Sequence, residues 1–389
     1  MINPVDVRVV IRGWGSVSAA GLGAAPAAGP TFQRHPQAAV PVAALPAAAE
    51  AALDALRRSR PAYRALDRSV LLALLAAQAA FQRAGWSPTD PASLAVSLGS
   101  SRGATERLET FHADFLRDGV PPTAASPLTT LGNVASWVAD SVGGAGAAIS
   151  HSSTCSTALQ ALGNALAWLR AGLAERFLAG GTEAPLTPFT LAQMQALGIY
   201  SALPATEYPC RPGAGGPSTF VLGEGAAVFA LEAVPAARPG DLLLESVGFG
   251  FEATGTKTGL TADGQHFQQA ARQALRLAGR QPAEVDLLVL HSPGTRAGDA
   301  AERRAVEAVF GKNLPACTSN KWQLGHTLGA SGALSLDLAL GILRGEISSE
   351  PLPFESWLNQ RPAPARPRRV LVQAAGFGGN AACALVSRV

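Results

Sequence analysis

The chain has 389 residues, of which 48% are hydrophobic and only 15% are charged, with a formal net charge of +3. This length and composition can bury a large core, which excludes a disordered polymer and a small disulfide-stapled scaffold. The weak positive charge does not imply nucleic-acid binding. We therefore expect a globular protein with two domains or two similar halves.

The cysteines and the apolar stretches bear on cellular location. Four cysteines stand far apart without a CxxC pair: Cys155, Cys210, Cys317 and Cys383. This spacing argues against a disulfide framework or a metal site and favours a reducing, cytoplasmic compartment. The first residues, MINPVDVRVVIRG, lack the features of a secretory signal. The apolar stretch 70–81 is shorter than the roughly 20 residues of a bilayer span, so we expect a buried helix and no membrane insertion.

Strand-like and helix-like segments alternate along the chain, which is typical of an α/β protein. The pattern predicts, in chain order, a strand at 7–11, helices at 47–57 and 69–84, a strand at 94–98, a helix at 155–169 and a strand at 176–178, followed by a second series. The Pro-, Ala- and Gly-rich stretch 234–240 is typical of a connector. We therefore divide the chain into an N-terminal half, 1–240, and a C-terminal half, 241–389.

The second series repeats the first. The predicted strand at 94–100 matches 286–292, and each follows a helix that ends in Ala-Gly. The apolar helix face at 162–170 recurs at 336–344, and each of these helices is followed by an arginine and a strand that ends in Gly-Gly. Several matches in the same order indicate an internal duplication.

Cys155 lies in the segment ISHSSTCSTALQALGNALAWLRAG, where small hydroxyl residues lead into a periodic helix. The positive end of a helix dipole favours thiolate, so this position predicts a nucleophile with a lowered pKa. The alternative is a small buried core residue, as most free cysteines are, and the segment taken alone favours that alternative.

Two histidines in the second half favour the nucleophile. His291 directly follows the apolar strand VDLLVL, and α/β proteins place ligands and catalytic groups at such strand ends. His326, in SNKWQLGHTLGASGALS, approaches the helix that matches the Cys155 helix, and Lys321 is nearby in sequence. The duplication therefore places Cys155 and His326 at matching edges of the two halves. The loop GFGG at 376–379 can bring backbone N–H groups close to a ligand.

The ordered set STCSTA, GGTE, LGEGA, HSPGTRAGDAAE, NKWQLGHTLGASG and GFGG resembles the β-ketoacyl synthases of the thiolase superfamily over nearly the whole chain. The resemblance implies a thiolase-like α/β fold, in which two duplicated βαβαβαββ-type halves form a layered α/β/α/β/α core. It also implies an elongating ketosynthase of the discrete, type II kind, from a divergent branch.

The resemblance implies a role for each motif residue. Cys155 is the nucleophile, His291 and His326 are the catalytic histidines, and Lys321 is the motif lysine. The GFGG loop at 376–379 corresponds to the gate loop of the family, and the backbone N–H groups of Phe377 in this loop and of Cys155 form the oxyanion hole. The remaining implied residues bind substrate (Thr295, Gly376 and Gly378) or are structural acids (Glu183, Glu224, Asp299 and Glu302).

The implied reaction is a decarboxylative Claisen condensation. Cys155 takes an acyl group from a carrier thioester, a malonyl-type extender loses CO2, and the resulting enolate attacks the acyl group while His291 and His326 donate hydrogen bonds to its oxygen. The reaction needs no metal and no separate cofactor, because an acyl carrier protein holds the substrates on its phosphopantetheine. The implied pathways are fatty-acid, polyketide or polyene-type biosynthesis, and the implied partners are the carrier protein and a ketosynthase chain in a homodimer or heterodimer.

Three positions depart from the family pattern. Pro293 replaces a threonine that holds the pantetheine arm, which leaves Thr295. Ser335 stands where the family commonly has a glutamate, so an acidic partner of Lys321 is missing or supplied elsewhere, and Asn380 replaces the threonine after GFGG.

Two other functions stay open. A non-catalytic chain-length factor usually lacks the nucleophile, whereas this chain keeps Cys155 together with His291 and His326. A thiolase or another acyltransferase would use the same cysteine, but thiolases add a second catalytic cysteine near the C-terminus. Only Cys383 is available there, in an apparent core strand.

Two further features concern partners. Arginines gather at what we take for the start of a helix and again at 361–369. The first group consists of Arg57, Arg58, Arg60, Arg64 and Arg68. These arginines form either an ordinary solvated face or a docking site for an acidic carrier protein. We also expect the strand at 147–150 to pair with a dimer partner.

Overall fold

The computed structural model describes residues 7–23, 31–89, 93–253, 255 and 260–389. The N-terminal residues 1–6, part of the segment with which we argue against a secretory signal, lie outside the described residues. The strands before the connector are β1 (Arg8–Ser18), β2 (Gly21–Leu22), β3 (Gln33–Arg34), β4 (Pro41–Val42), β5 (Leu94–Gly99), β6 (Ala148–His151), β7 (Arg176–Glu183) and β8 (Gly225–Val234). Those after it are β9 (Leu242–Phe251), β10 (Leu287–Val289), β11 (Ala316–Thr318), β12 (Arg369–Gly376) and β13 (Asn380–Arg388).

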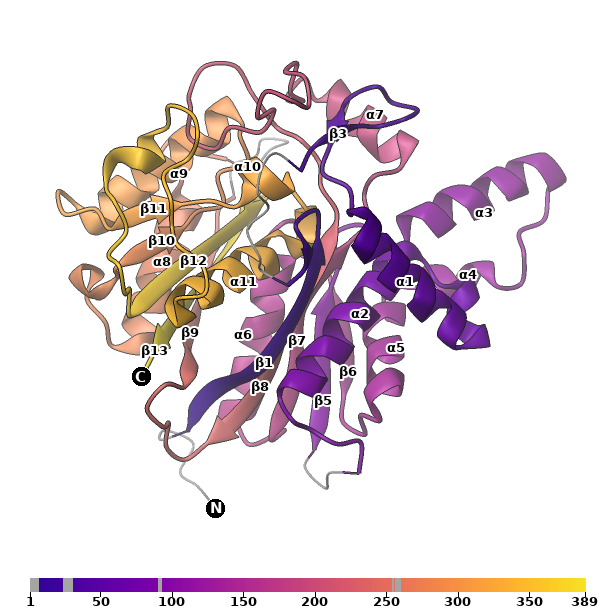
Figure 1. The fold of residues 1–389 in the computed structure, drawn as a ribbon, viewed down its shortest axis with the longest axis horizontal. Helices are drawn as coiled ribbons and strands as arrows, with labels where there is room; N and C mark the ends of the chain where they lie inside the picture. The colour runs from indigo at the N-terminus through magenta and orange to yellow at the C-terminus, as the bar shows by residue number, and fades with distance from the viewer. Residues whose placement is uncertain (1–6, 24–30, 90–92, 254, 256–259) are drawn as a thin grey trace.

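Helices flank these strands on both sides (Figure 1). The first half contains α1 (Ala47–Ser59), η2 (Pro61–Ala65), α2 (Arg68–Arg83), α3 (Thr105–Asp118), α4 (Ala125–Thr129), α5 (Asn133–Val142), α6 (Thr157–Arg170) and α7 (Pro188–Ala196). The second half contains α8 (Gln265–Ala278), η3 (Pro282–Glu284), α9 (Arg296–Phe310), α10 (Lys321–Leu324), η4 (Leu328–Ala330), α11 (Ser331–Arg344) and η5 (Trp357–Gln360).

The strand order is the same in the two halves. The first half reads β6-β5-β7-β8-β1 and the second reads β11-β10-β12-β13-β9. In each half the second strand, β5 or β10, runs parallel to both its neighbours, and the fourth strand, β8 or β13, runs antiparallel to both of its neighbours. The two series meet where Val10 of β1 pairs with Leu243 of β9. This repetition confirms the predicted α/β class and the internal duplication.

Two helices lie in the middle of the layered core. α6 contacts β5 and β7 on one side and β9 on the other, and α11 contacts β12 and β8. α2 and α5 cover the outer face of the first half, and α8 and α9 cover that of the second (Figure 1). Small residues allow the central helices to approach closely, because a Cβ added at Gly332 of α11 would lie only 2.6 Å from Leu159 of α6.

The apolar stretch at 70–81 forms most of α2 and is buried, as predicted. The helix begins at Arg68 because the side chain of Asp67 accepts a hydrogen bond from the Ser69 N–H at 2.8 Å and so caps it. In the part of the chain that the structure describes, no helix is both long enough and apolar enough to cross a bilayer.

The first arginine group does not mark the start of one helix, because it extends from α1 through η2 to the first residue of α2. Arg68 points inward: it forms ion pairs with Glu224 at 2.6 Å and with Glu50 at 2.5 Å. Our expectation that all five arginines share one exposed face, either solvated or carrier-docking, is therefore wrong for Arg68. Arg58 and Arg64 remain exposed.

The expected dimer strand forms β6, at one edge of the sheet. Its residues are half-buried or exposed, so its free side can pair with another strand.

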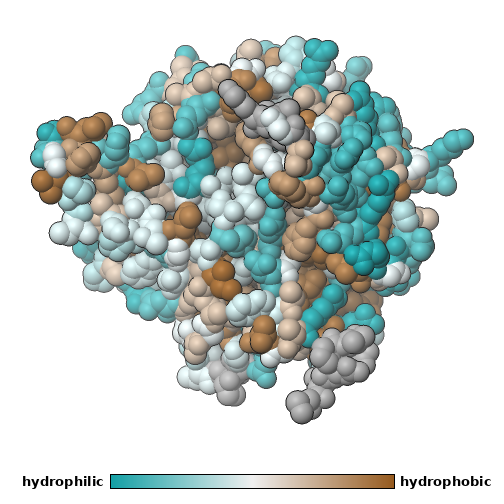
Figure 2. All heavy atoms as spheres, turned by 180° about the vertical axis from the view of Figure 1, so that it is seen from behind, coloured by the Kyte–Doolittle hydropathy of each residue, from teal (hydrophilic) through white to brown (hydrophobic). Residues whose placement is uncertain are grey.

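Apolar side chains also gather on the projection formed by α3 and α4 (Figure 2). The exposed residues of this apolar patch are Leu108, Phe115, Leu116, Val120 and Leu131. Such a patch is typical of a protein interface.

We predict that the chain forms a dimer through this region, alone or with a homologous chain. Light scattering should give about twice the chain mass. Leu116→Asp should weaken the dimer because it places a charge in the apolar patch, whereas Leu173→Asp, at another exposed leucine, should not. A stable, active monomer of the unaltered chain at low concentration would contradict the prediction.

Candidate active site

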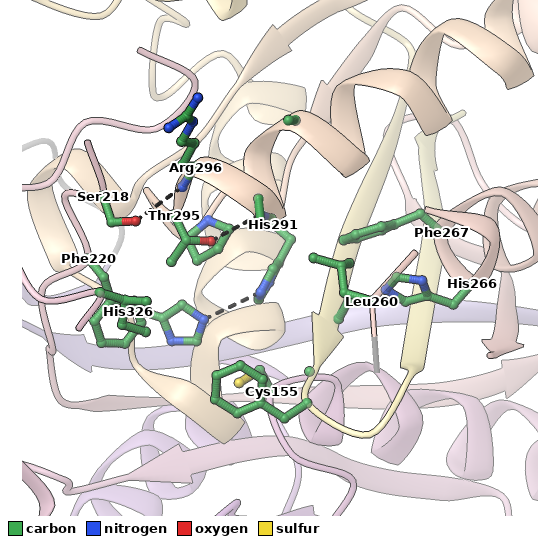
Figure 3. Close-up of a pocket in the computed structure, with 18 of the residues that line it drawn as sticks. Cys155, Ser218, Phe220, Leu260, His266, Phe267, His291, Thr295, Arg296 and His326 are labelled. Atoms are coloured by element: carbon green, nitrogen blue, oxygen red, sulfur yellow. Dashed lines mark hydrogen bonds between the residues drawn. The ribbon is translucent and has the colours of Figure 1, made fainter. Parts of the chain in front are cut away.

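A cavity of about 680 Å³ lies where the two halves meet, and Cys155, His291 and His326 line it together (Figure 3). Cys155 lies just before α6, His291 follows β10, and His326 follows α10. The other candidate residues that line it are Thr295, Gly376 and Phe377. The remaining candidates, including Lys321 and Gly378, do not line it.

The gate loop lies directly against the backbone of Cys155. Thr154 has a φ of 54°, in the left-handed region, and its hydroxyl donates to the Phe377 carbonyl at 3.3 Å. A Cβ added at Gly376 would lie 2.6 Å from the Cys155 nitrogen, so only glycine fits there. Strained backbone of this kind is common at functional sites.

Burial raises the pKa of the Cys155 thiol to about 12, with a smaller contribution from Glu183 in the same direction, whereas Lys321 lowers it. The predicted lowering of the pKa by a helix N-terminus is therefore wrong. Helix α6 begins only at Thr157, and the side chain of Cys155 is almost completely removed from water. Desolvation outweighs the dipole here, so the resting group is a neutral thiol.

The raised pKa predicts how alkylation of Cys155 depends on pH. Because thiolate is the reactive form, its rate with iodoacetamide should rise by about ten-fold per pH unit between about pH 7 and 10. The rate can be followed by mass spectrometry of the peptide that contains Cys155. A plateau below about pH 8 would contradict the raised pKa, since a plateau marks complete ionisation.

The two cavity histidines face each other, with their Nε2 atoms 3.4 Å apart and their ring planes at 85°. The backbone N–H of Leu328 donates to Nδ1 of His326 at 3.0 Å, so the neutral ring carries its proton on Nε2. Burial holds the pKa of both histidines well below the usual value, and the charge of Lys321 lowers both further. Both imidazoles are therefore neutral at physiological pH.

Two buried carboxyl groups hold the turn that carries His291. Glu302 accepts hydrogen bonds from the backbone N–H groups of His291 at 2.7 Å and Ser292 at 2.6 Å. Asp299 accepts from the N–H groups of Gly213 and Gly294, and burial raises its pKa to about 7. These contacts fix the backbone beside the imidazole.

Thr295 has a local role besides lining the cavity. Its hydroxyl accepts from the Gly298 N–H at 3.2 Å and so caps α9. Where the family commonly has a glutamate, Ser335 instead donates to the Asn320 side chain at 3.4 Å.

Lys321 is buried, and its Nζ has no hydrogen-bond partner in the part of the chain that the structure describes. Burial lowers its pKa to about 8, although the nearby acids Glu302 and Asp299 act in the opposite direction. Lys321 does not line the cavity, and its charge lowers the pKa of three groups that do: Cys155, His291 and His326.

The other two acidic candidates connect distant segments. Glu183 accepts from the N–H groups of Ser101 at 2.7 Å and Gly329 at 2.8 Å, and so joins the loop after β5 to η4 of the second half. Glu224 accepts from the Leu45 N–H at 3.2 Å and pairs with Arg68.

Sequence reasoning missed His266, which also lines the cavity, and its partner Glu252. Neither residue belongs to a motif, and the structure alone places the start of α8 beside the end of β9. Among the residues that the structure describes, no cluster of His, Cys, Asp and Glu has the arrangement of a metal site.

Comparison with known families identifies the chain. The model of the β-ketoacyl synthase N-terminal domain matches residues 31–237, and that of the β-ketoacyl synthase C-terminal domain matches 243–353. The two matches cover most of the chain, which therefore belongs to the β-ketoacyl synthase family.

Individual relatives agree with this family. The tetracenomycin polyketide synthase ketoacyl synthase alpha subunit of Streptomyces glaucescens is 33% identical over 353 residues, which cover 83% of this chain and 81% of that protein. The 3-oxoacyl-(acyl-carrier-protein) synthase 2 of Staphylococcus aureus strain N315 is 31% identical over 285 residues, or 70% of this chain and 68% of that protein. The structure of the ishigamide ketosynthase/chain length factor has a TM-score of 0.85 at 21% identity, covering 98% of this chain and 99% of that chain, and confirms the thiolase-like fold.

Proposed function

We propose that the protein is an acyltransferase that elongates a carrier-bound acyl chain by decarboxylative condensation with a malonyl thioester. One observation carries the proposal: Cys155, His291 and His326 line a single cavity. In this assignment residues 1–240 supply the nucleophile and residues 241–389 supply both histidines. The four cysteines are free thiols, which fits a cytoplasmic enzyme.

The first step transfers the acyl group to Cys155. The sulfur attacks the thioester carbonyl, the bond to the carrier sulfur breaks, and the proton of the Cys155 thiol passes to the departing carrier thiol. Because the resting thiol is neutral, this proton must leave as the sulfur attacks, and the neutral imidazoles of His291 and His326 line the same cavity. The backbone N–H groups of Cys155 and Phe377 are the assigned donors to the tetrahedral oxygen.

The second step forms the carbon–carbon bond. The malonyl group loses CO2, and the electron pair left behind forms an enolate with its charge on the thioester oxygen. His326 presents an Nε2–H towards the cavity, and Nδ1 of His291 has no partner among the described residues, so His291 can also place its proton on Nε2. An oxygen between the two rings then accepts both hydrogen bonds. The enolate carbon attacks the acyl carbonyl, and Cys155 leaves as the thiolate.

The second candidate function is that of a chain-length factor, the non-catalytic partner in some ketosynthase heterodimers. The similar ishigamide ketosynthase/chain length factor is a pair of this kind by its name. The shared cavity favours catalysis, because a subunit that only shapes the product has no need of the nucleophile and both histidines.

Intact mass spectrometry separates the two functions. The protein, alone and with any co-purifying homologue, is incubated with a panel of acyl-carrier proteins, and malonyl carrier is then added. A catalytic chain should gain the mass of one acyl group and lose it after malonyl carrier is added. A chain that gains no acyl mass from any carrier, while its partner does, would have the chain-length-factor role.

We predict that the acidic carrier protein docks near α1 and η2. Charge reversal at exposed Arg58 and Arg64 should raise KM for acyl-carrier substrate and weaken its dependence on salt. Turnover of small acyl-pantetheine mimics should stay nearly unchanged, since these residues lie outside the cavity.

The matched control for this docking surface is charge reversal at Arg366 and Arg368, exposed residues of the second arginine group. If the control pair alone raises KM for carrier substrate, the carrier docks on the second group. If both substrates respond alike to the Arg58 and Arg64 changes, these arginines support the fold and do not bind the carrier.

A further inference from the structure

The cavity wall contains a third imidazole, which the proposed reaction does not use. His266 lies in the first turn of α8 and is only 1% exposed. Its Nδ1 is 2.8 Å from Oε2 of Glu252, and its backbone N–H donates to the same oxygen at 3.2 Å. Glu252 directly follows β9 and is also buried. The two side chains therefore form a buried histidine–carboxylate pair at the cavity.

This pair contacts the gate loop and adjoins His291 through Phe267. The Glu252 N–H donates to the Gly379 carbonyl at 3.0 Å. The ring of His266 packs on Phe267 with a centroid distance of 4.6 Å, and Phe267 lies 6.3 Å from the ring of His291. Figure 3 shows His266 and Phe267 on the opposite side of His291 from Ser218. His266 thus belongs to a separate wall of the same cavity.

The hydrogen bonds determine which ring atom is available to a ligand. A carboxylate only accepts, so Nδ1 of His266 carries the proton that points to Glu252. Burial lowers the pKa of His266 more than Glu252 raises it, which keeps the ring neutral. Its Nε2 is then a lone-pair acceptor, and no described residue donates to it. This nitrogen is open to the cavity, where a ligand that supplies a donor can pair with it.

We propose that Nε2 of His266 accepts a hydrogen bond from a hydroxyl group on the acyl chain of the bound thioester. This inference rests on the proposed function, because it requires an acyl group in the cavity that Cys155 shares with His266. Figure 3 shows Leu260 and Phe267 near His266, and both add apolar surface to this wall. A site that hydrogen-bonds a substrate hydroxyl discriminates against the analogue without it far better than an apolar wall does.

Other polar groups fit this wall less well. A ketone or an ester carbonyl offers no donor to Nε2, and the neutral ring has no second proton to give. A carboxylate only accepts hydrogen bonds, so it also offers no donor to Nε2. A hydroxyl group supplies the missing donor without adding a charge.

Binding of unreactive substrate analogues tests the proposal without any need for turnover. The probes are amide analogues of octanoyl-pantetheine, either unsubstituted or with a hydroxyl group on carbon 3, 5 or 7 of the chain. Calorimetry gives Kd for each. At least one hydroxylated isomer should bind the unaltered protein about 5- to 10-fold more tightly than the octanoyl parent, the scale of one hydrogen bond.

Two variants separate ligand binding from structural support. In His266→Asn the side-chain NH2 can still donate to Glu252 but the acceptor Nε2 is gone, whereas His266→Phe removes both. We expect both variants to lose the preference for the hydroxylated chain. Phe267→Leu, which changes the shape of the same wall without a polar atom, should change Kd for both probes alike.

The proposal is overturned if no isomer binds more than about two-fold tighter than the parent, or if the preference survives in His266→Asn. Loss in the phenylalanine variant alone would assign His266 a purely structural role. Failure of this inference is distinct from failure of the proposed function: a protein that accepts acyl groups on Cys155 but binds both probes equally contradicts only the inference.

Discussion

Cys155→Ala is expected to abolish acylation completely, because no other thiol lines the cavity in the part of the chain that the structure describes. After incubation with acyl carrier, intact mass spectrometry should show the unmodified mass for this variant and one added acyl group for the unaltered chain. The condensation product should also be absent. The physical reason is that only a group at the end of the pantetheine arm's path can receive the acyl chain.

Cys317→Ala is the matched control. Cys317 lies in β11 and does not line the cavity, although burial also raises its pKa to about 12. This variant should be acylated like the unaltered chain. If acyl mass persists in Cys155→Ala, the nucleophile has been assigned to the wrong residue.

His291→Ala and His326→Ala are each expected to lower malonyl decarboxylation by roughly 100-fold or more, the scale for removal of one donor to a developing oxyanion. Each variant removes an imidazole whose Nε2 lies 3.4 Å from that of its neighbour, so the enolate oxygen keeps only one of its two donors. Release of CO2 from malonyl carrier measures this step separately from acyl transfer.

The control is His112→Ala, at an exposed histidine on α3 that lies outside the cavity. It should decarboxylate at the normal rate. Circular dichroism should confirm that the two cavity variants still fold, since the turn that carries His291 is held through its backbone by Glu302. Near-normal decarboxylation in a folded His291→Ala or His326→Ala protein would remove that histidine from the mechanism.

The sequence was sufficient to predict those features of the fold that depend on hydrophobic periodicity and on the order of elements along the chain. The repeat of helix and strand patterns predicted two halves, and the structure has the same strand order in each. That repeat also placed Cys155 and His326 at matching edges, and both line one cavity. Such inferences succeed because hydrophobic periodicity along the chain directly reflects which face of an element is buried.

Features that depend on contacts between distant segments could not be predicted. The pKa of Cys155 depends on its burial beneath a gate loop that comes more than two hundred residues later in the chain. The inward orientation of Arg68 depends on Glu224, which lies 156 residues away. The partnership of His266 and Glu252 involves neither a motif nor a periodic pattern. In each case the local sequence contains no signal of the partner.

The position of the cavity between the two halves has a genetic consequence. The proposed nucleophile comes from one half and both proposed catalytic imidazoles come from the other half of the same polypeptide. Two inactive proteins, one without Cys155 and the other without His291, would therefore each lack an indispensable group in every cavity they form. Co-expression of the two alleles would not restore a working enzyme through mixed dimers, so the two lesions would belong to a single complementation group.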